Sequence, residues 1–182
     1  YFGNIFRFSS FGESHGRGLG ILIDGMPSGI RYEKEIIDDM ICRRRPGQSK
    51  IVTQRKEDDE FEIISGIYNG YTIGSPICSI TYNKDQRSKD YGDIKDVFRP
   101  NHADYTYLKK YGIRDHRGGG RASARETLAR VISGAFSRMA INTIYDKSTM
   151  NVHAFVSQIG DLRYSGEVDY DFINTNDLYA PN

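Results

Sequence analysis

The residues best suited to chemistry in this 182-residue chain form one glycine-rich segment, Arg117-Gly118-Gly119-Gly120-Arg121-Ala122-Ser123-Ala124-Arg125-Glu126. Ser123, with Glu126 three positions later, matches a capping box, so the glycines precede a predicted helix N-terminus. The unpaired N–H groups of such a terminus attract anions, and glycines let a ligand approach the backbone. Arg121 and Arg125 add guanidinium groups that suit phosphate or carboxylate. The segment therefore predicts an anion site, with a flexible hinge before a capped helix as the alternative.

Two of the histidines stand where they could transfer protons. His15 follows a predicted strand in Phe11-Gly12-Glu13-Ser14-His15-Gly16, whose glycines predict a sharp turn that exposes Ser14 and His15. His102 stands at the predicted start of a helix, a position that suits a general acid near a departing anion. Adjacent side chains rarely point at each other and no Gly-x-Ser-x-Gly motif is present, so Ser14 and His15 do not indicate a hydrolase. His116 and His153 are interpreted as surface groups, and no Cys/His spacing predicts a metal site.

The composition is that of a globular chain with little overall charge. Hydrophobic residues make up 38% and charged residues 27%, and the net charge is +1. Such a charge gives no global attraction to nucleic acid or anionic lipid, and no apolar run predicts a membrane span. Two cysteines, Cys42 and Cys78, favour a reducing cytoplasm over a secreted disulfide framework. Basic residues concentrate in 43–56 and 99–130, which form either two solvated faces or parts of one polyanion site.

Hydrophobic periodicity predicts the elements that would position these groups. The predicted helices are Glu33–Arg45, His102–Tyr111 and Ser123–Tyr145. The predicted strands are Asn4–Ser10, Gly20–Gly25, Phe61–Gly66, Ile67–Tyr71, Ser75–Tyr82 and Val152–Ile159. Strict βαβ alternation is missing, which favours an α+β fold with antiparallel strands packed on helices. The length suits a single domain over residues 1–182.

Several motifs, in their order along the chain, resemble the chorismate synthase family. Besides the glycine-rich segment and the His15 turn, they are Arg43-Arg44-Arg45-Pro46-Gly47, Thr53-Gln54-Arg55, Asp85-Gln86-Arg87-Ser88, Asp90-Tyr91, Phe98-Arg99-Pro100 and His102-Ala103-Asp104-Tyr105. Family proteins are longer, so the chain resembles their N-terminal half. The resemblance implies an α/β sandwich with helices between antiparallel sheets, of which about half would be present here. It also implies a homotetramer for the full-length protein.

The resemblance further implies a reaction. Such enzymes convert 5-enolpyruvylshikimate 3-phosphate to chorismate and phosphate by an anti-1,4-elimination, the last step of the shikimate pathway in aromatic amino acid biosynthesis. The reaction requires reduced FMN, for which NADPH is a candidate reductant. By this resemblance, His102 would protonate the departing phosphate. His15 would stabilise or protonate the anionic reduced flavin, with Ser14 in a supporting relay.

The remaining roles implied by the resemblance belong to anion-binding positions. The substrate anions would be held by Arg45, Arg99 and Arg125. The flavin would be contacted by Arg121, Ala122 and Ser123, and a pyridine-nucleotide phosphate by Arg44 and Lys50. Lys50 stands where many relatives have Arg, which replaces a bidentate contact by a point charge. Ala122 stands where many have Ser, which removes a hydroxyl but no backbone N–H.

Two alternatives to a complete enzyme stay open. A nucleic-acid-binding module would use the same basic segments with aromatic side chains on a strand platform, whereas here the glycines lead into a helix. A truncated chain could bind ligand or pack without being active. We expect a small-molecule substrate, no nucleic-acid partner, no membrane and no metal.

Overall fold

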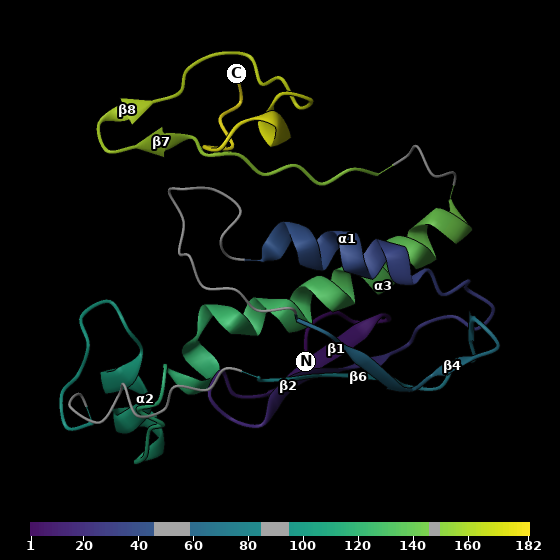
Figure 1. The fold of residues 1–182 in the computed structure, drawn as a ribbon, viewed down its shortest axis with the longest axis horizontal. Helices are drawn as coiled ribbons and strands as arrows, with labels where there is room; N and C mark the ends of the chain where they lie inside the picture. The colour runs from purple at the N-terminus through teal and green to yellow at the C-terminus, as the bar shows by residue number, and fades with distance from the viewer. Residues whose placement is uncertain (46–58, 85–94, 146–149) are drawn as a thin grey trace.

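The fold is built around one antiparallel sheet with helices on one of its faces (Figure 1). The computed structural model describes residues 1–45, 59–84, 95–145 and 150–182. The sheet has the order β1-β2-β6-β3, and its strands are β1 (Arg7–Gly12), β2 (Gly18–Asp24), β6 (Ile77–Tyr82) and β3 (Glu62–Ser65). Adjacent strands all run antiparallel. The expected α+β class is confirmed, since no parallel pair occurs within the described ranges.

Two helices cover the sheet and close the core. The long helix α3 (Thr127–Ile144) lies over β2, and α1 (Lys34–Arg44) packs against α3 (Figure 1). Their apolar positions recur at helical spacing, and burial of that stripe is the main source of helix stability in a protein. The best-buried core side chains come from both helices and the two central strands: Ile21, Ile23, Ile37, Ile41, Ile77, Leu128, Ala135, Phe136 and Met139.

Small hairpins and short helices complete the description. The predicted strand Ile67–Tyr71 is a hairpin, in which the turn Asn69-Gly70 joins β4 (Ile67–Tyr68) to β5 (Tyr71–Thr72) and both turn residues have positive φ. The C-terminal segment carries β7 (Gln158–Ile159), β8 (Leu162–Arg163) and the short helix η4 (Ile173–Thr175). In Figure 1 this segment lies beyond α1, on the side away from the sheet.

The predicted strand Val152–Ile159 is wrong over most of its length. Only its last residues, Gln158 and Ile159, pair with another strand. Val152 is 91% exposed, so the alternation of apolar residues here does not mark a buried strand face. A strand needs a paired strand for its backbone hydrogen bonds, and among the described residues 152–157 have only isolated bonds, from the N–H of Val156 to the Tyr179 carbonyl and from the N–H of Tyr164 to the Ser157 carbonyl.

The helix predicted from Ser123 begins later and in pieces. The chain forms the 3₁₀ turns η2 (Gly120–Ala122) and η3 (Ala124–Glu126) before α3 starts at Thr127. Ser123 Oγ does accept a hydrogen bond from the N–H of Arg125, at 3.3 Å. Glu126, the other half of the predicted capping box, instead binds the guanidinium of Arg121. The guanidinium offers a charged donor to each of the two carboxylate oxygens, whereas the capping box would have offered one uncharged N–H.

Candidate active site

The turn between β1 and β2 carries His15, and it is buried. Ser14 and His15 are each 4% exposed, which corrects the expectation of an exposed turn. Their side chains do meet, because Ser14 Oγ lies 3.1 Å from His15 Nδ1. Gly118 covers the ring: its φ is +59°, and a Cβ added there would lie 2.0 Å from His15 Nδ1. Only glycine allows this approach, so the burial of His15 depends on the glycine-rich segment.

His102 contacts the next glycine along the same segment. Gly119 has φ +88°, and a Cβ added there would lie 2.4 Å from His102 Cε1. His102 precedes α2 (Asp104–Tyr111), which begins two residues after the predicted start. Consecutive glycines therefore lie against two imidazoles that are far apart in the sequence. The glycine-rich segment brings together both histidines that the sequence singled out.

A buried carboxylate lies beside His102. Asp104 accepts two hydrogen bonds from the Arg99 side chain, from Nε and Nη2 at 2.9 Å each, and Arg114 Nη1 is 3.2 Å away. The hydrogen-bonded Arg99 guanidinium, with a smaller contribution from Arg114, holds the pKa of Asp104 well below its usual range. Arg99 Nη2 also lies 3.4 Å from His102 Nδ1. Since a guanidinium only donates, a neutral His102 accepts at Nδ1 and carries its proton on Nε2.

The Arg121 guanidinium is held by hydrogen bonds to other residues of the protein. Its Nη1 donates to Glu126 at 2.6 Å and to the Gly12 carbonyl at 2.8 Å, and its Nη2 donates to Ser10 Oγ at 2.7 Å. These contacts explain why an arginine stands before a helix whose dipole disfavours it. They join the end of β1 to the start of α3. The neighbouring predicted flavin contacts, Ala122 and Ser123, lie in and directly after η2.

Arg44 and Arg125 share one buried counter-ion, Asp59. Arg44 Nη2 lies 2.6 Å from Asp59 Oδ2, and Arg125 Nη1 lies 2.8 Å from Asp59 Oδ1. The Asp59 side chain is fully buried. Sequence reasoning missed Asp59 because it sits in a run of acidic residues that are usually solvated. Arg45 follows directly as the C-cap of α1, and the predicted nucleotide contact Lys50 lies outside the described residues.

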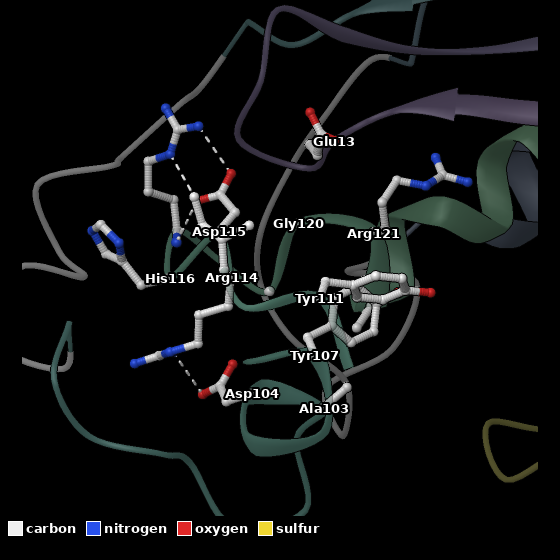
Figure 2. A pocket seen from close by; sticks show the side chains of 14 residues that line it. Glu13, Ala103, Asp104, Tyr107, Tyr111, Arg114, Asp115, His116, Gly120 and Arg121 are labelled. Atoms are coloured by element: carbon white, nitrogen blue, oxygen red, sulfur yellow. Dashed lines mark hydrogen bonds and ion pairs between the residues drawn. The ribbon is translucent and has the colours of Figure 1, made fainter. Parts of the chain in front are cut away.

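A cavity of about 570 Å³ opens beside the glycine-rich segment (Figure 2). Gly119 and Gly120 line it on one side, and Tyr107 and Tyr111 of α2 line it on another. Arg117 at its edge binds Asp115 at 2.9 Å and lowers the pKa of that carboxyl. The remaining lining residues come from the turn bearing His15 and from the 103–122 stretch: Glu13, Ala103, Asp104, Ile113, Arg114, His116, Arg121 and Ala122. The cavity combines glycine backbone, aromatic side chains and paired charges. Neither His15 nor His102 lines it, but Gly119 in its wall lies against His102.

Comparison with known proteins decides the family. The sequence profile described as chorismate synthase matches residues 6–181. The chain belongs to the chorismate synthase family. Chorismate synthases of Bacteroides thetaiotaomicron and Cytophaga hutchinsonii are 50% and 53% identical to it, over the whole of this chain and 50% of each relative. A crystal structure titled chorismate synthase superposes with a TM-score of 0.72 at 27% identity, covering 98% of this chain and 49% of that one. The chain thus spans about half the length of the relatives it matches.

Two other expectations concern membranes and metals. Among the helices in the described part of the chain, none is both long and apolar enough to cross a bilayer. Within the same part, no group of three or more His, Cys, Asp or Glu side chains is arranged to hold a metal ion.

Proposed function

We propose that the full-length protein is a chorismate synthase that converts 5-enolpyruvylshikimate 3-phosphate to chorismate and phosphate by anti-1,4-elimination. The observation that carries this proposal is the contact of Gly118 with His15 and of Gly119 with His102, in a chain of this family. These contacts unite the two proton-transfer groups with the segment whose composition suits an anion. The reaction is a lyase step of aromatic amino acid biosynthesis.

His102 acts as the general acid in this proposal. The proton that it donates is the one on Nε2, because Nδ1 faces the Arg99 guanidinium at 3.4 Å. Donation of that proton to the departing phosphate neutralises charge as the C–O bond breaks, which is the usual task of a positioned imidazole. The donating form is the imidazolium, whose charge is stabilised by Asp104 Oδ1, 3.9 Å from Nδ1, and the transfer leaves a neutral ring that accepts from Arg99 at Nδ1.

In this proposal, His15 and Ser14 act on the bound flavin. Ser14 Oγ lies between His15 Nδ1, at 3.1 Å, and the Gly118 carbonyl, at 3.4 Å. A hydroxyl has one proton, so Ser14 can donate either to the carbonyl or to the imidazole. That choice lets His15 hold its own proton on Nδ1 or on Nε2. His15 can therefore stabilise an anion next to it or protonate it.

The residues around the cavity fit reduced FMN. Gly119 and Gly120 leave backbone unshielded by side chains, and Tyr107 and Tyr111 offer aromatic surface to a planar ring system. Arg121, Ala122 and Ser123 would hold the cofactor, Arg121 chiefly through its backbone because its guanidinium is engaged with Glu126. Bound reduced FMN would supply electron density to the breaking C–O bond.

The arginines bind the substrate anions as groups that are already oriented. Arg99 and Arg125 each use part of the guanidinium to bind a buried carboxylate. Prior orientation lowers the entropy lost when a ligand carboxylate or phosphate binds. Arg45 completes the substrate set, and Arg44 and Lys50 would bind the phosphate of NADPH. We further propose a homotetramer in the cytoplasm.

The test is a product assay on the full-length protein under anaerobic conditions. With reduced FMN present, we expect chorismate and phosphate to appear in equal amounts from 5-enolpyruvylshikimate 3-phosphate. With oxidised FMN and no reductant, we expect neither product. Equal turnover in the absence of flavin would contradict the proposal.

A further inference from the structure

Asn83, directly after β6, donates three hydrogen bonds to the turn that carries His15. Its side-chain Nδ2 donates to the carbonyls of Glu13, at 3.0 Å, and Gly16, at 2.9 Å. Its backbone N–H donates to the Arg17 carbonyl at 3.0 Å. The two carbonyls bound by one amide flank Ser14 and His15 on both sides. The amide therefore fixes the width and orientation of the turn.

The orientation of the Asn83 amide is itself determined by a neighbour. Arg125 Nε donates to Asn83 Oδ1 at 2.7 Å. Because Arg125 can only donate and the two carbonyls can only accept, a single orientation of the amide satisfies all three bonds. Arg125 is anchored in turn on the buried carboxylate of Asp59, at 2.8 Å. A series of hydrogen bonds thus connects the buried Asp59 carboxylate, through Arg125 and Asn83, to the His15 turn.

We propose that Asn83 is a positioning residue for His15, an inference that rests on the proposed function for its catalytic consequence. The turn is also held by backbone bonds from the N–H of Gly16 to the Glu13 carbonyl, at 3.1 Å, and from the N–H of Ser14 to the Gly120 carbonyl, at 3.4 Å. With the amide in place, the His15 ring stays against Gly118 and within reach of Ser14. Without it, the turn gains freedom to move the ring out of the site. The same amide accepts a hydrogen bond from Arg125, so the main test variant has to keep that contact.

The Asn83→Asp substitution tests this inference because it keeps the shape and removes both amide donors. The carboxylate still accepts from Arg125, but its second oxygen faces two carbonyl oxygens and repels them. The matched control is Asn69→Asp, the same chemical change in the exposed β4–β5 turn. Asn83→Ser is a second variant, which removes the carbonyl contacts without adding charge.

The first measurement needs no activity. Diethyl pyrocarbonate modifies accessible imidazoles, and mass spectrometry gives the rate at each histidine. His15 is 4% exposed and His153 is exposed, so His153 serves as an internal reference. We expect the rate at His15 to rise about tenfold in both Asn83 variants and to stay unchanged in Asn69→Asp, because local opening governs access to a buried group. An unchanged rate at His15 in the folded Asn83 variants would overturn the inference.

The second measurement separates positioning from a general structural role. In the full-length protein we expect both Asn83 variants to lower kcat for phosphate release, which is measured at saturating substrate because Asn83 also binds Arg125, a proposed substrate contact. In a His15→Ala background, Asn83→Asp should lower kcat no further, because a residue that acts through His15 has nothing left to position. An additional loss in the double variant would overturn the inference. If the parent protein itself releases no phosphate, the proposed function fails, while the labelling experiment still decides the role of Asn83.

Discussion

At the scale of single residues, the contact between glycines and imidazoles is the feature on which the site depends. The sequence identified His15, His102 and the glycine-rich segment, each for its own chemistry. It did not predict that Gly118 would bury His15, because a close approach across more than a hundred residues leaves no local pattern. The burial of Ser14 and His15, and their 3.1 Å contact, follow from that approach.

The Gly118→Ala substitution tests this contact directly. The new methyl group would stand 2.0 Å from His15 Nδ1, so His15 or the segment must move. Gly112→Ala is the matched control, since Gly112 also has a positive φ, +74°, but nothing lies within 4 Å of its added Cβ. We expect the control to lose about 1–2 kcal/mol of unfolding free energy from backbone strain alone. Gly118→Ala should lose more and should also lower kcat.

Urea unfolding and phosphate release measure the two effects. Equal losses of stability in the two glycine variants, with full activity in both, would show that Gly118 and His15 are not in tight contact.

At the scale of elements, hydrophobic periodicity predicted the main helices and central strands correctly. The capping box at Ser123 and the strand over Val152–Ile159 were predicted less well. The apolar stripes of α1 and α3 and the central strands were predicted because burial of one face repeats every few residues. The capping box failed because Arg121 offered Glu126 a stronger partner. The strand predicted over Val152–Ile159 failed because an extended run becomes a strand only beside another strand.

Asp104, at the start of α2, should make the free energy of unfolding depend on pH. The hydrogen-bonded Arg99 lowers the pKa of Asp104 in the folded protein, below the value of about 3.9 that an aspartate has when unfolded. The ionised carboxylate therefore contributes stability that is fully present above that unfolded value, and this contribution is lost as pH falls below it toward the folded pKa. We expect Asp104→Asn to be less stable at neutral pH and to lose less stability than the parent below about pH 4.

Urea unfolding across the range from neutral to acid pH measures this difference. Asp161→Asn, at an exposed carboxylate in the β7–β8 turn, is the control and should follow the parent at every pH. A variant at Asp104 that showed the same acid dependence as the parent would contradict the role of the Arg99 pair.

At the scale of the whole molecule, buried acid–arginine pairs tie together segments that lie far apart in sequence. The basic segments stand out in the sequence, but their partners inside the chain could not be predicted from it. Asp59 reaches Arg125 across 66 positions, and Asn83 reaches the His15 turn across a similar span. Such contacts depend on how the sheet and α3 are placed relative to each other. The resemblance predicted the family, whereas the network that holds the site needed the structure.

The central claim is that the site formed by the two histidines and the glycine-rich segment performs the elimination. The most direct test is His102→Ala in the full-length protein with reduced FMN, by single-turnover phosphate release and by separate substrate binding. We expect the rate to fall about a hundredfold or more with substrate affinity largely retained, because a general acid acts in the transition state. His153→Ala, at an exposed histidine outside the site, should behave as the parent. An unchanged rate in His102→Ala, or a loss of binding alone, would contradict the account.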